Sequence, residues 1–264
     1  MLNLFKIEWL KIKTYRTFWL LYLSFVIFFP ALLFFIAYKF MNARFANFEE
    51  MTLKALAGSP FVFPKIWHTS SYMAGYFFLV IGMLYILLIT NEVQYRTHRQ
   101  NIIDGWSRID FLKAKFTLLI FFVITTTIVV FLSAMLIGYI YTPAGFQFTD
   151  GLYYVGYFII MATVYLMVAF LIAILVKRTG LSIIIYFVLV CIVDNLLWAA
   201  LTIQQNQMGF FMPVEVADTL IPNPSGLLRT RTIPDIVMVF SALGYATIYG
   251  WIIVNYFRKT DLKT

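Results

Sequence analysis

Residues 116–141 read FTLLIFFVITTTIVVFLSAMLIGYIY and contain no charged side chain. An α-helix rises about 1.5 Å per residue, so this stretch is long enough to cross a hydrocarbon layer of roughly 30 Å. A soluble protein would have to cover every face of such a helix with other parts of the protein. A lipid bilayer keeps all of these faces away from water. The stretch therefore predicts a transmembrane helix.

Five further apolar runs of similar length lie along the chain. They are residues 18–38, 70–90, 152–176, 181–201 and 235–257. The composition agrees with them, because 62% of the residues are hydrophobic and 12% are charged, whereas soluble domains carry about 25% charged residues. We predict a single all-α integral membrane domain over residues 1–264, with six transmembrane helices.

The first residues, 1–17, are basic and precede an apolar run, as in a signal peptide. That run is about 20 residues long and no small-residue cleavage site follows it, so we expect a retained first span. Phe5, Trp9 and Ile12 recur at helical spacing, which predicts an interfacial helix over 1–17 with an apolar stripe. Glu8 falls within that stripe. The alternative is a basic anchor that continues the first span.

The positions of the basic residues predict the orientation of the chain. If both termini are cytoplasmic, fourteen of the 20 Lys and Arg residues fall in inner segments and six in outer segments. The positive-inside rule favours this arrangement. We therefore expect a multi-pass protein of the cell inner (cytoplasmic) membrane with both termini cytoplasmic. The net charge of +8 then reflects topology and lipid headgroups rather than nucleic acid.

Three of the connections between spans are long enough to carry function. Residues 39–69 would lie outside, and because they contain Gly58-Ser59-Pro60 and Pro64 we expect broken helix and turn there rather than a folded domain. Residues 91–115 would lie in the cytoplasm, and their charges of both signs suit a helix-turn-helix that docks a partner; an ordinary positive-inside loop is the alternative. Residues 202–234 would lie outside and combine large apolar residues with prolines. Since exposing this segment to water is costly, we expect it to re-enter the membrane or pack on it as an outer gate.

Asp194 is the acidic residue that lies well inside a predicted span, and Asn195 follows it. A carboxylate at the bilayer centre costs roughly 2.5–3.5 kcal/mol on insertion scales, so it should face protein or a cavity. We regard both residues as candidates for lining a translocation path. An interhelical clamp and a local hydrogen bond without a transport role are the alternatives.

The motifs of common enzyme classes are absent from the sequence. The chain has no GxxxxGK[ST] phosphate loop, no HExxH, no GxSxG and no paired CxxC. His68 and His98 are predicted on opposite sides of the membrane, so they cannot share a metal. Cys191 has no partner for an intrachain disulfide. We expect no catalytic residue, no metal site and no cofactor in this chain.

The chain resembles the permease subunits of ABC-2 type (type V exporter-like) transporters, six-span half-transporters that pair with a separate ATP-binding subunit. The resemblance rests on a Glu8-x-x-Lys11 pair in the interfacial helix and on Leu220-Ile221-Pro222-Asn223-Pro224 between spans five and six. It also rests on the loop after span two. That loop begins at Glu92 and runs through Arg96, Arg99 and Gly105-Trp106-Ser107-Arg108 to Lys115.

The resemblance implies an ATP-driven exporter of an amphipathic, lipid-like or peptide substrate, built from two permease chains and two ATPase subunits that supply the ATP and Mg²⁺ chemistry. We assign the ATPase-coupling role to Glu92, Arg96, Arg99, Gly105 and Arg108. We assign the outer gate to Pro213, Glu215, Leu220, Ile221, Pro222 and Pro224. Two alternatives from other classes stay open: a membrane-embedded lipid-modifying enzyme with Asp194 in its site, and a noncatalytic scaffold of a membrane complex.

Overall fold

The computed structural model describes residues 2–42, 59–95, 108–143, 149–202, 207–224 and 232–259. These residues are helical or in turns, and they include no strand. Among them, six helical stretches are long and apolar enough to cross a membrane. They are Arg16–Asn42, Lys65–Gln94, Ile109–Tyr141, Tyr153–Val176, Thr179–Thr202 and Asp235–Lys259. The prediction of an all-α membrane domain with six spans is confirmed, and the chain is a multi-pass membrane protein.

The first span is preceded by a short helix that crosses one end of the bundle. This helix, α1 (Leu2–Ile12), packs on the beginning of α7 (Arg108–Tyr141). The span itself consists of α2 (Arg16–Leu23), a π-helical turn η1 (Ser24–Phe28) and α3 (Phe29–Asn42). Pro30 is the second residue of α3, so the carbonyl four residues before it lies within the π turn. Because proline has no amide hydrogen and crowds the carbonyl four residues earlier, it accounts for the irregular turn.

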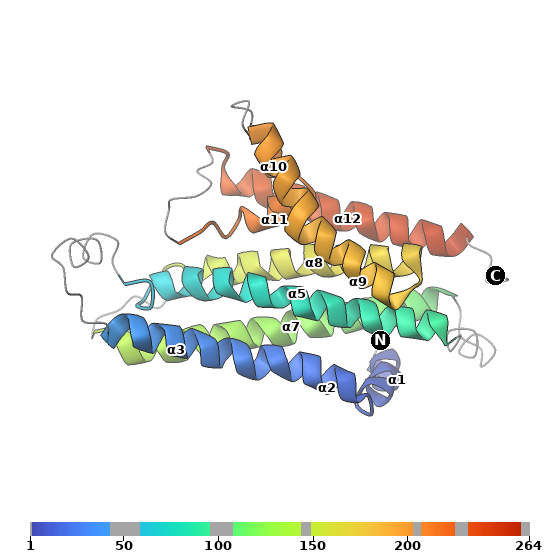
Figure 1. The fold of residues 1–264 in the computed structure, drawn as a ribbon, viewed down its shortest axis with the longest axis horizontal. Helices are drawn as coiled ribbons and strands as arrows, with labels where there is room; N and C mark the ends of the chain where they lie inside the picture. The colour runs from blue at the N-terminus through green and yellow to red at the C-terminus, as the bar shows by residue number, and fades with distance from the viewer. Residues whose placement is uncertain are drawn as a thin grey trace.

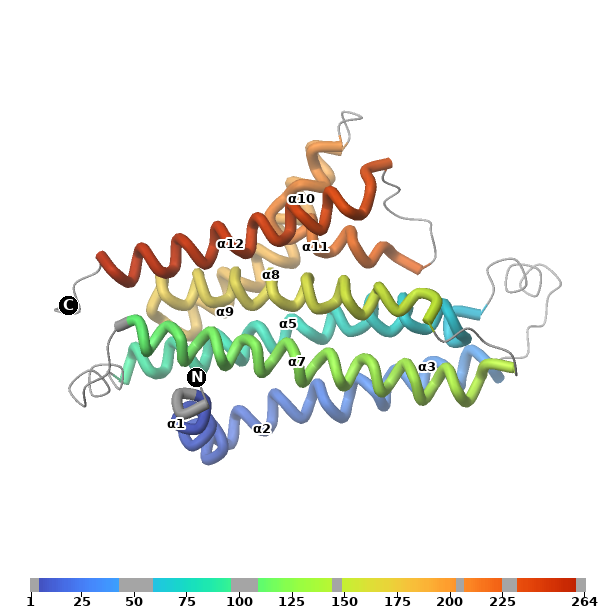
Figure 2. The backbone as a smooth tube through the Cα atoms, turned by 180° about the vertical axis from the view of Figure 1, so that it is seen from behind, coloured from blue at the N-terminus to red at the C-terminus, as the bar shows by residue number. Residues whose placement is uncertain are grey.

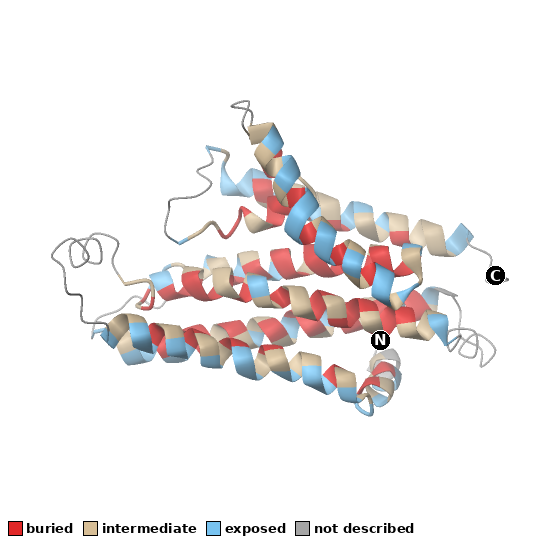
Figure 3. Cartoon of the chain, viewed as in Figure 1, coloured by how far each residue is buried: buried red, intermediate tan, exposed pale blue. Residues whose placement is uncertain are grey.

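The centre of the bundle is the pair α5 (Lys65–Gln94) and α8 (Tyr153–Val176), which pack along their length. Figure 3 shows that buried residues concentrate on these two helices. Gly82 of α5 lies against the buried Tyr186, and a Cβ atom at Gly82 would collide with the Tyr186 ring. This glycine therefore allows span five to approach α5 closely.

Span five diverges from the bundle along its length (Figure 1). It consists of α9 (Thr179–Val188), a second π turn η2 (Leu189–Val193) and α10 (Asp194–Thr202). A 3₁₀ turn, η3 (Gln207–Phe211), and a short helix, α11 (Glu215–Asp218), follow it. The last helix, α12 (Asp235–Lys259), packs on α8. The outward faces of α9, α10 and α12 carry exposed large apolar side chains, as contact with lipid requires.

The two ends of the bundle differ in what they contain (Figures 1 and 2). The α1 end holds α1, the end of α5, the start of α7, the junction of α8 with α9 and the end of α12. The opposite end holds the end of α3 and the start of α5, and the segment with η3 and α11 lies towards it. The helices extend past the predicted spans, as in 65–94 against 70–90, because a helix continues through polar residues outside the hydrocarbon.

Candidate functional site

An ionic network ties α1 to the bundle at the α1 end. The Lys115 ammonium on α7 lies 2.6 Å from Glu8 Oε2 of α1 and 2.7 Å from Glu92 Oε1 at the end of α5. Lys11 lies 3.4 Å from Glu8 Oε1 and 3.6 Å from Glu92 Oε1. Two cations and two carboxylates from three helices therefore balance one another. We call Glu8, Lys11, Glu92 and Lys115 the ionic network.

The core of the ionic network is withdrawn from solvent. The side chain of Lys115 is 0% exposed and that of Glu8 is 1% exposed. Burial by itself raises the pKa of the Glu8 carboxyl, but the attraction of Lys115 and Lys11, together with their hydrogen bonds, lowers it below its ordinary value. The attraction outweighs the cost of burial at Glu8, which makes the network a firm joint between α1 and α7.

A second polar contact connects α5 with span five at the same end. Thr179, the first residue of α9, lies with its hydroxyl 2.9 Å from the Thr90 hydroxyl and 3.3 Å from Asn91 Oδ1. Asn91 Nδ2 donates to the Tyr15 hydroxyl at 3.1 Å, just before span one. The end of α5 is thus joined to α1, α7, the start of span one and the start of span five.

The described residues 207–224 pack between α10 and α12, and we call them the outer segment after the predicted orientation of the chain. Asp194 is buried and accepts hydrogen bonds from the backbone amides of Val214 at 3.3 Å and Glu215 at 2.5 Å. The first amides of a helix have no partner within it, so the carboxylate caps α11 from another helix. Asp194 therefore fixes the outer segment to span five.

Two more contacts hold the outer segment in place. The His68 Nε2 atom of α5 donates to the Pro222 carbonyl at 2.6 Å, and the His68 ring stacks on Tyr154 with centroids 4.2 Å apart. At the other side, a Cβ atom on Gly209 would lie 2.7 Å from the Trp198 carbonyl oxygen. Glycine is required there because the outer segment approaches the α10 backbone so closely.

Asn195 has a local role beside Asp194. Its Nδ2 atom donates to the carbonyls of Val190 at 3.2 Å and Cys191 at 3.3 Å. These two carbonyls belong to the π turn η2. A π turn shifts the regular hydrogen-bond ladder of a helix, and the Asn195 amide binds carbonyls in that irregular stretch.

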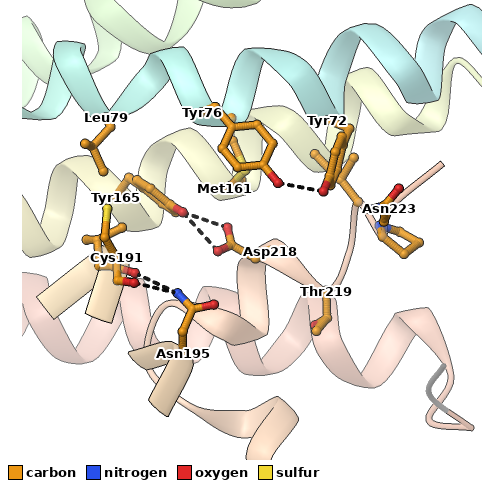
Figure 4. Close-up of a pocket in the computed structure, with 14 residues that line it drawn as sticks. Tyr72, Tyr76, Leu79, Met161, Tyr165, Cys191, Asn195, Asp218, Thr219 and Asn223 are labelled. Atoms are coloured by element: carbon orange, nitrogen blue, oxygen red, sulfur yellow. Dashed lines mark hydrogen bonds between the residues drawn. The ribbon is translucent and has the colours of Figure 1, made fainter. Parts of the chain in front are cut away.

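A cavity of about 540 Å³ lies between α5, α8, span five and the outer segment, and we call it the α11 cavity (Figure 4). Its polar lining includes Tyr72 and Tyr76 of α5, Tyr165 of α8, Asn195 of α10 and Asp218 of α11. The Tyr165 hydroxyl donates to the Asp218 carboxylate, with oxygens at 2.9 and 3.0 Å. Ligand pockets in proteins have volumes of about 300–1,000 Å³, so the cavity has the size of a binding site.

The residues assigned to ATPase coupling occupy different places. Glu92 is in the ionic network, at the end of α5. Arg108 begins α7, but its side chain is not among those described. Arg96, Arg99 and Gly105 lie outside the described residues. The direct contact with an ATPase subunit therefore stays a prediction.

The residues assigned to the outer gate lie together in the outer segment. Glu215, Leu220 and Ile221 are buried, Pro213 and Pro222 are half-buried, and Pro224 is exposed. Of the two candidates for a translocation path, Asn195 lines the α11 cavity, whereas Asp194 is not among its lining residues. A gating role for the segment and a path role for Asp194 and Asn195 remain predictions.

The sequence analysis named all four members of the ionic network as motif residues but did not pair Glu8 or Glu92 with Lys115. It missed Asp218 and its partner Tyr165 entirely. A signal was present, because Asp218 is one of two acidic residues, with Glu215, in the largely apolar stretch VEVADTLIP. Within the described part of the chain, no group of three or more His, Cys, Asp or Glu side chains is placed to hold a metal ion.

The lowered pKa of Glu8 predicts an acid-sensitive joint. Its ordinary value is 4.5, so the stability that Glu8 contributes is present above that pH and is lost as the pH falls through the lowered folded-state value. We expect the free energy of unfolding of the wild type to exceed that of Glu8→Gln at neutral pH. Denaturation in mixed dodecyl sulfate and maltoside micelles at several pH values measures this difference, which should shrink on acidification below 4.5. A difference that is independent of pH would contradict the prediction.

Comparison with known families places these features in context. A family model described as ABC-2 family transporter protein matches residues 4–193. The match covers more than half of the chain and includes the whole ionic network, the first four spans and span five as far as the end of η2. A search of curated proteins finds no match to the chain. The chain belongs to the ABC-2 transporter family, and it is a membrane permease subunit.

Proposed function

We propose that this chain is the membrane half of an ATP-driven exporter of the inner (cytoplasmic) membrane, with both termini in the cytoplasm. Two copies, or this chain and a related one, would form the path, and separate ATP-binding subunits would supply ATP hydrolysis with Mg²⁺. The substrate would be amphipathic, lipid-like or a peptide. The observation that carries the proposal is the ionic network, which joins an interfacial helix to the spans at the end where such a subunit would bind.

The ionic network explains how a partner could move the spans. Glu8 on α1, Glu92 on α5 and Lys115 on α7 share one buried centre, so displacement of any of these helices displaces the others. The 91–115 connection leaves this centre from Glu92 and returns to it at Lys115. A subunit that pushes on this connection or on α1 would therefore tilt spans two and three together, and the Thr179 contact would extend the motion to span five.

The outer segment is suited to respond at the other end of span five. Asp194 links α10 to the start of α11, so a tilt of span five pulls on α11 directly. His68 anchors the far end of the segment to α5 through Pro222. Movement of α5 relative to span five would pull these two anchors apart, which would open or close a route beneath the outer segment.

This arrangement favours the exporter over the lipid-modifying enzyme. That alternative needs Asp194 at a reactive site, and the Asp194 carboxylate instead binds two backbone amides. A carboxylate that is bound to the backbone in this way is not free to act on a substrate, so the lipid-modifying enzyme would lack its reactive group. A noncatalytic scaffold would not need the α11 cavity of about 540 Å³ beside an outer segment that is attached to both span five and α5.

Purification of the tagged chain from its native membrane tests the proposal. We expect a second chain with a GxxxxGK[ST] loop to copurify, and we expect ATP hydrolysis by the complex but not by the isolated chain. The double variant Arg99→Glu, Arg108→Glu should release this subunit or abolish the coupling of hydrolysis to transport. Lys113→Glu, which changes an exposed charge in the same connection, is the matched control and should behave as the wild type.

Three results would count against the proposal or its details. ATP hydrolysis by the pure chain alone would exclude a half-transporter. Purification without any ATP-binding subunit would favour a scaffold. If the double variant binds the subunit and couples normally, the docking site is not in the 91–115 connection and α1 is the next surface to test.

A further inference from the structure

We propose that the exposed face of α1, together with the start of span one, binds the headgroup of an anionic phospholipid. The headgroup lies against Lys6, Lys13 and Arg16, which we call the basic patch, and an acyl chain lies along span one. The leaflet rests on the proposed function: with both termini cytoplasmic, it is the inner one. The binding itself does not depend on export and can be measured on the chain alone.

The depth of α1 in the membrane is the first argument. Glu8 of α1 pairs with Lys115, which is the last charged residue of α7. Phe121 lies further along α7, in its charge-free part, and its ring contacts those of Phe5 and Trp9 with centroids 5.4 and 5.6 Å away. The helix α1 therefore lies at the boundary between headgroups and hydrocarbon, where an amphipathic helix lies in the plane of the membrane.

The face of α1 that does not pack on the bundle is basic and apolar at once. The predicted apolar stripe contacts the protein, so another face is left for the lipid. Lys6, Leu10 and Lys13 follow one another at i, i+4 and i+7, share one side of the helix and are exposed. At a headgroup boundary, a lysine lays its methylene groups on apolar surface and places its ammonium among the phosphates.

The charges of the basic patch are not balanced by the described part of the chain. Glu8 is the acidic residue of the segment 2–23, and its buried carboxylate pairs with Lys115 and Lys11. The three cations of the basic patch form no ion pair with a described residue. An anionic lipid supplies the missing charge, whereas a zwitterionic headgroup carries no net charge.

A path for the acyl chain begins at Arg16. Leu20, Leu23 and Ile27 follow Arg16 by four, seven and eleven residues, so they lie along one side of span one. All three side chains are exposed. Span one lies at the edge of the bundle in both views (Figures 1 and 2). A headgroup at Arg16 therefore has an apolar surface directly beside it for its chain.

Trp19 joins the two parts of the site. Its Nε1 atom donates to the Lys13 carbonyl at 2.9 Å, and its ring lies edge-on to Trp9 with centroids 6.1 Å apart. Tryptophan concentrates at the interface between membrane and water. The contact fixes the end of α1 against the start of span one. Since Lys13 and Arg16 are three residues apart across this junction, one headgroup can contact both.

Quenching of Trp19 by brominated lipid tests the proposal. Bromine on an acyl chain quenches a tryptophan that it contacts. The chain in uncharged maltoside micelles is titrated with brominated phosphatidylglycerol, which is anionic, or with brominated phosphatidylcholine, which is zwitterionic. The chain has six tryptophans, so Trp19→Phe is measured as well and the difference from the wild type is the Trp19 signal. We expect half-maximal quenching at a mole fraction at least about tenfold lower for the anionic lipid.

The triple variant Lys6→Gln, Lys13→Gln, Arg16→Gln removes the basic patch. These residues are exposed, so the variant should fold. Each cation near an anionic surface contributes about fivefold to binding, and without all three the mole fractions for the two lipids should agree within about twofold. A preference for the anionic lipid that survives in this variant overturns the proposal, as does equal quenching by the two lipids in the wild type.

The triple variant Arg178→Gln, Arg258→Gln, Lys259→Gln is the matched control. It removes three exposed cations at the same end of the bundle, so it changes the net charge by the same amount but leaves the basic patch intact. The preference of Trp19 for the anionic lipid should be unchanged. An equal loss of preference in both triple variants would show an effect of net charge and would overturn a site at α1.

The complex with an ATP-binding subunit separates this proposal from the proposed function. A preference for the anionic lipid in a chain that binds no such subunit would leave the site standing and refute the exporter. Coupled transport in a complex whose Trp19 shows no preference would refute the site alone. If neither lipid quenches Trp19 in the complex, the subunit covers the basic patch, and the patch is a docking surface for protein instead.

Discussion

Replacing Lys115 with methionine should lower the free energy of unfolding by about 3–5 kcal/mol. Methionine is of similar length and apolar, so the change removes the charge while largely keeping the volume. It leaves Glu8 and Glu92 close together and largely buried, with Lys11 as the cation that still lies near both. The two carboxylates would repel each other. They would also lose the Lys115 ammonium, which donates hydrogen bonds to them in place of water, so α1 should detach from α7. Denaturation in mixed micelles and proteolysis at the N-terminus measure the two effects.

Two variants serve as controls for Lys115→Met. Lys113→Met removes an exposed charge whose contact with Asp110 is 3.8 Å long, and such pairs contribute about 0–1 kcal/mol. The triple variant Lys115→Met, Glu8→Gln, Glu92→Gln removes the uncompensated charges and should recover much of the stability, because neutral groups are cheaper to bury. If the triple variant is as unstable as Lys115→Met, the loss comes from packing around Lys115 and not from charge.

The triple variant also separates stability from coupling. We expect it to fold and bind an ATP-binding subunit, but α1 would no longer be joined to α5 and α7 by charges. ATP hydrolysis should then no longer be coupled to transport, so the amount of substrate transported per ATP hydrolysed should fall. A triple variant that couples normally would show that the ionic network is a structural support alone.

Replacing Asp194 with leucine should free the outer segment. The amides of Val214 and Glu215 would lose their acceptor in a buried place, and each unsatisfied buried group costs about 1–3 kcal/mol. Leucine is similar in size and more compatible with lipid, so insertion of span five should not suffer. We expect lower stability and faster proteolysis within 207–224. Asp194→Asn keeps one oxygen acceptor and should show an intermediate effect.

Asp150→Leu is the matched control for Asp194. Asp150 is exposed in the turn before α8, so its replacement should change neither stability nor proteolysis of the outer segment. Unchanged proteolysis in Asp194→Leu would show that His68 and the close contact at Gly209 hold the segment without the carboxylate. The same result would argue against transmission from span five to α11.

The six spans could be predicted because each depends on a single run of residues. Residues 116–141 must lie in lipid or in protein whatever the rest of the chain does, since their apolar side chains and backbone allow no other stable state. Irregularities within the spans were not predicted. Pro30 gives a reason for the first π turn, but nothing in the residues of η2 distinguishes it from regular helix, and it became visible only with the amide of Asn195 bound to its carbonyls.

In the candidate sites too, the sequence predicted which residues are charged, and the structure showed which residues they contact. Glu8 interrupts the apolar stripe of α1 when the helix is considered alone. In the folded chain Glu8 forms an ion pair with Lys115, so the charged residue that interrupts the stripe is the one that binds α1 to α7. Glu92 was assigned to a docking surface because it is charged and near the membrane, and the structure places it in a largely buried joint. Charge patterns show where a charged side chain can be tolerated and do not specify its partner.

The sequence by itself determined the class of protein, the number of spans and the family resemblance, because transfer into lipid is a sum over neighbouring residues of one helix. The tertiary structure alone decided that Asp194 caps α11 and that Asp218 faces a cavity lined by Tyr72, Tyr76 and Tyr165. These contacts join residues far apart in the chain. They depend on how helices pack against one another, through shape and close approach, and hydropathy carries no information about which faces meet.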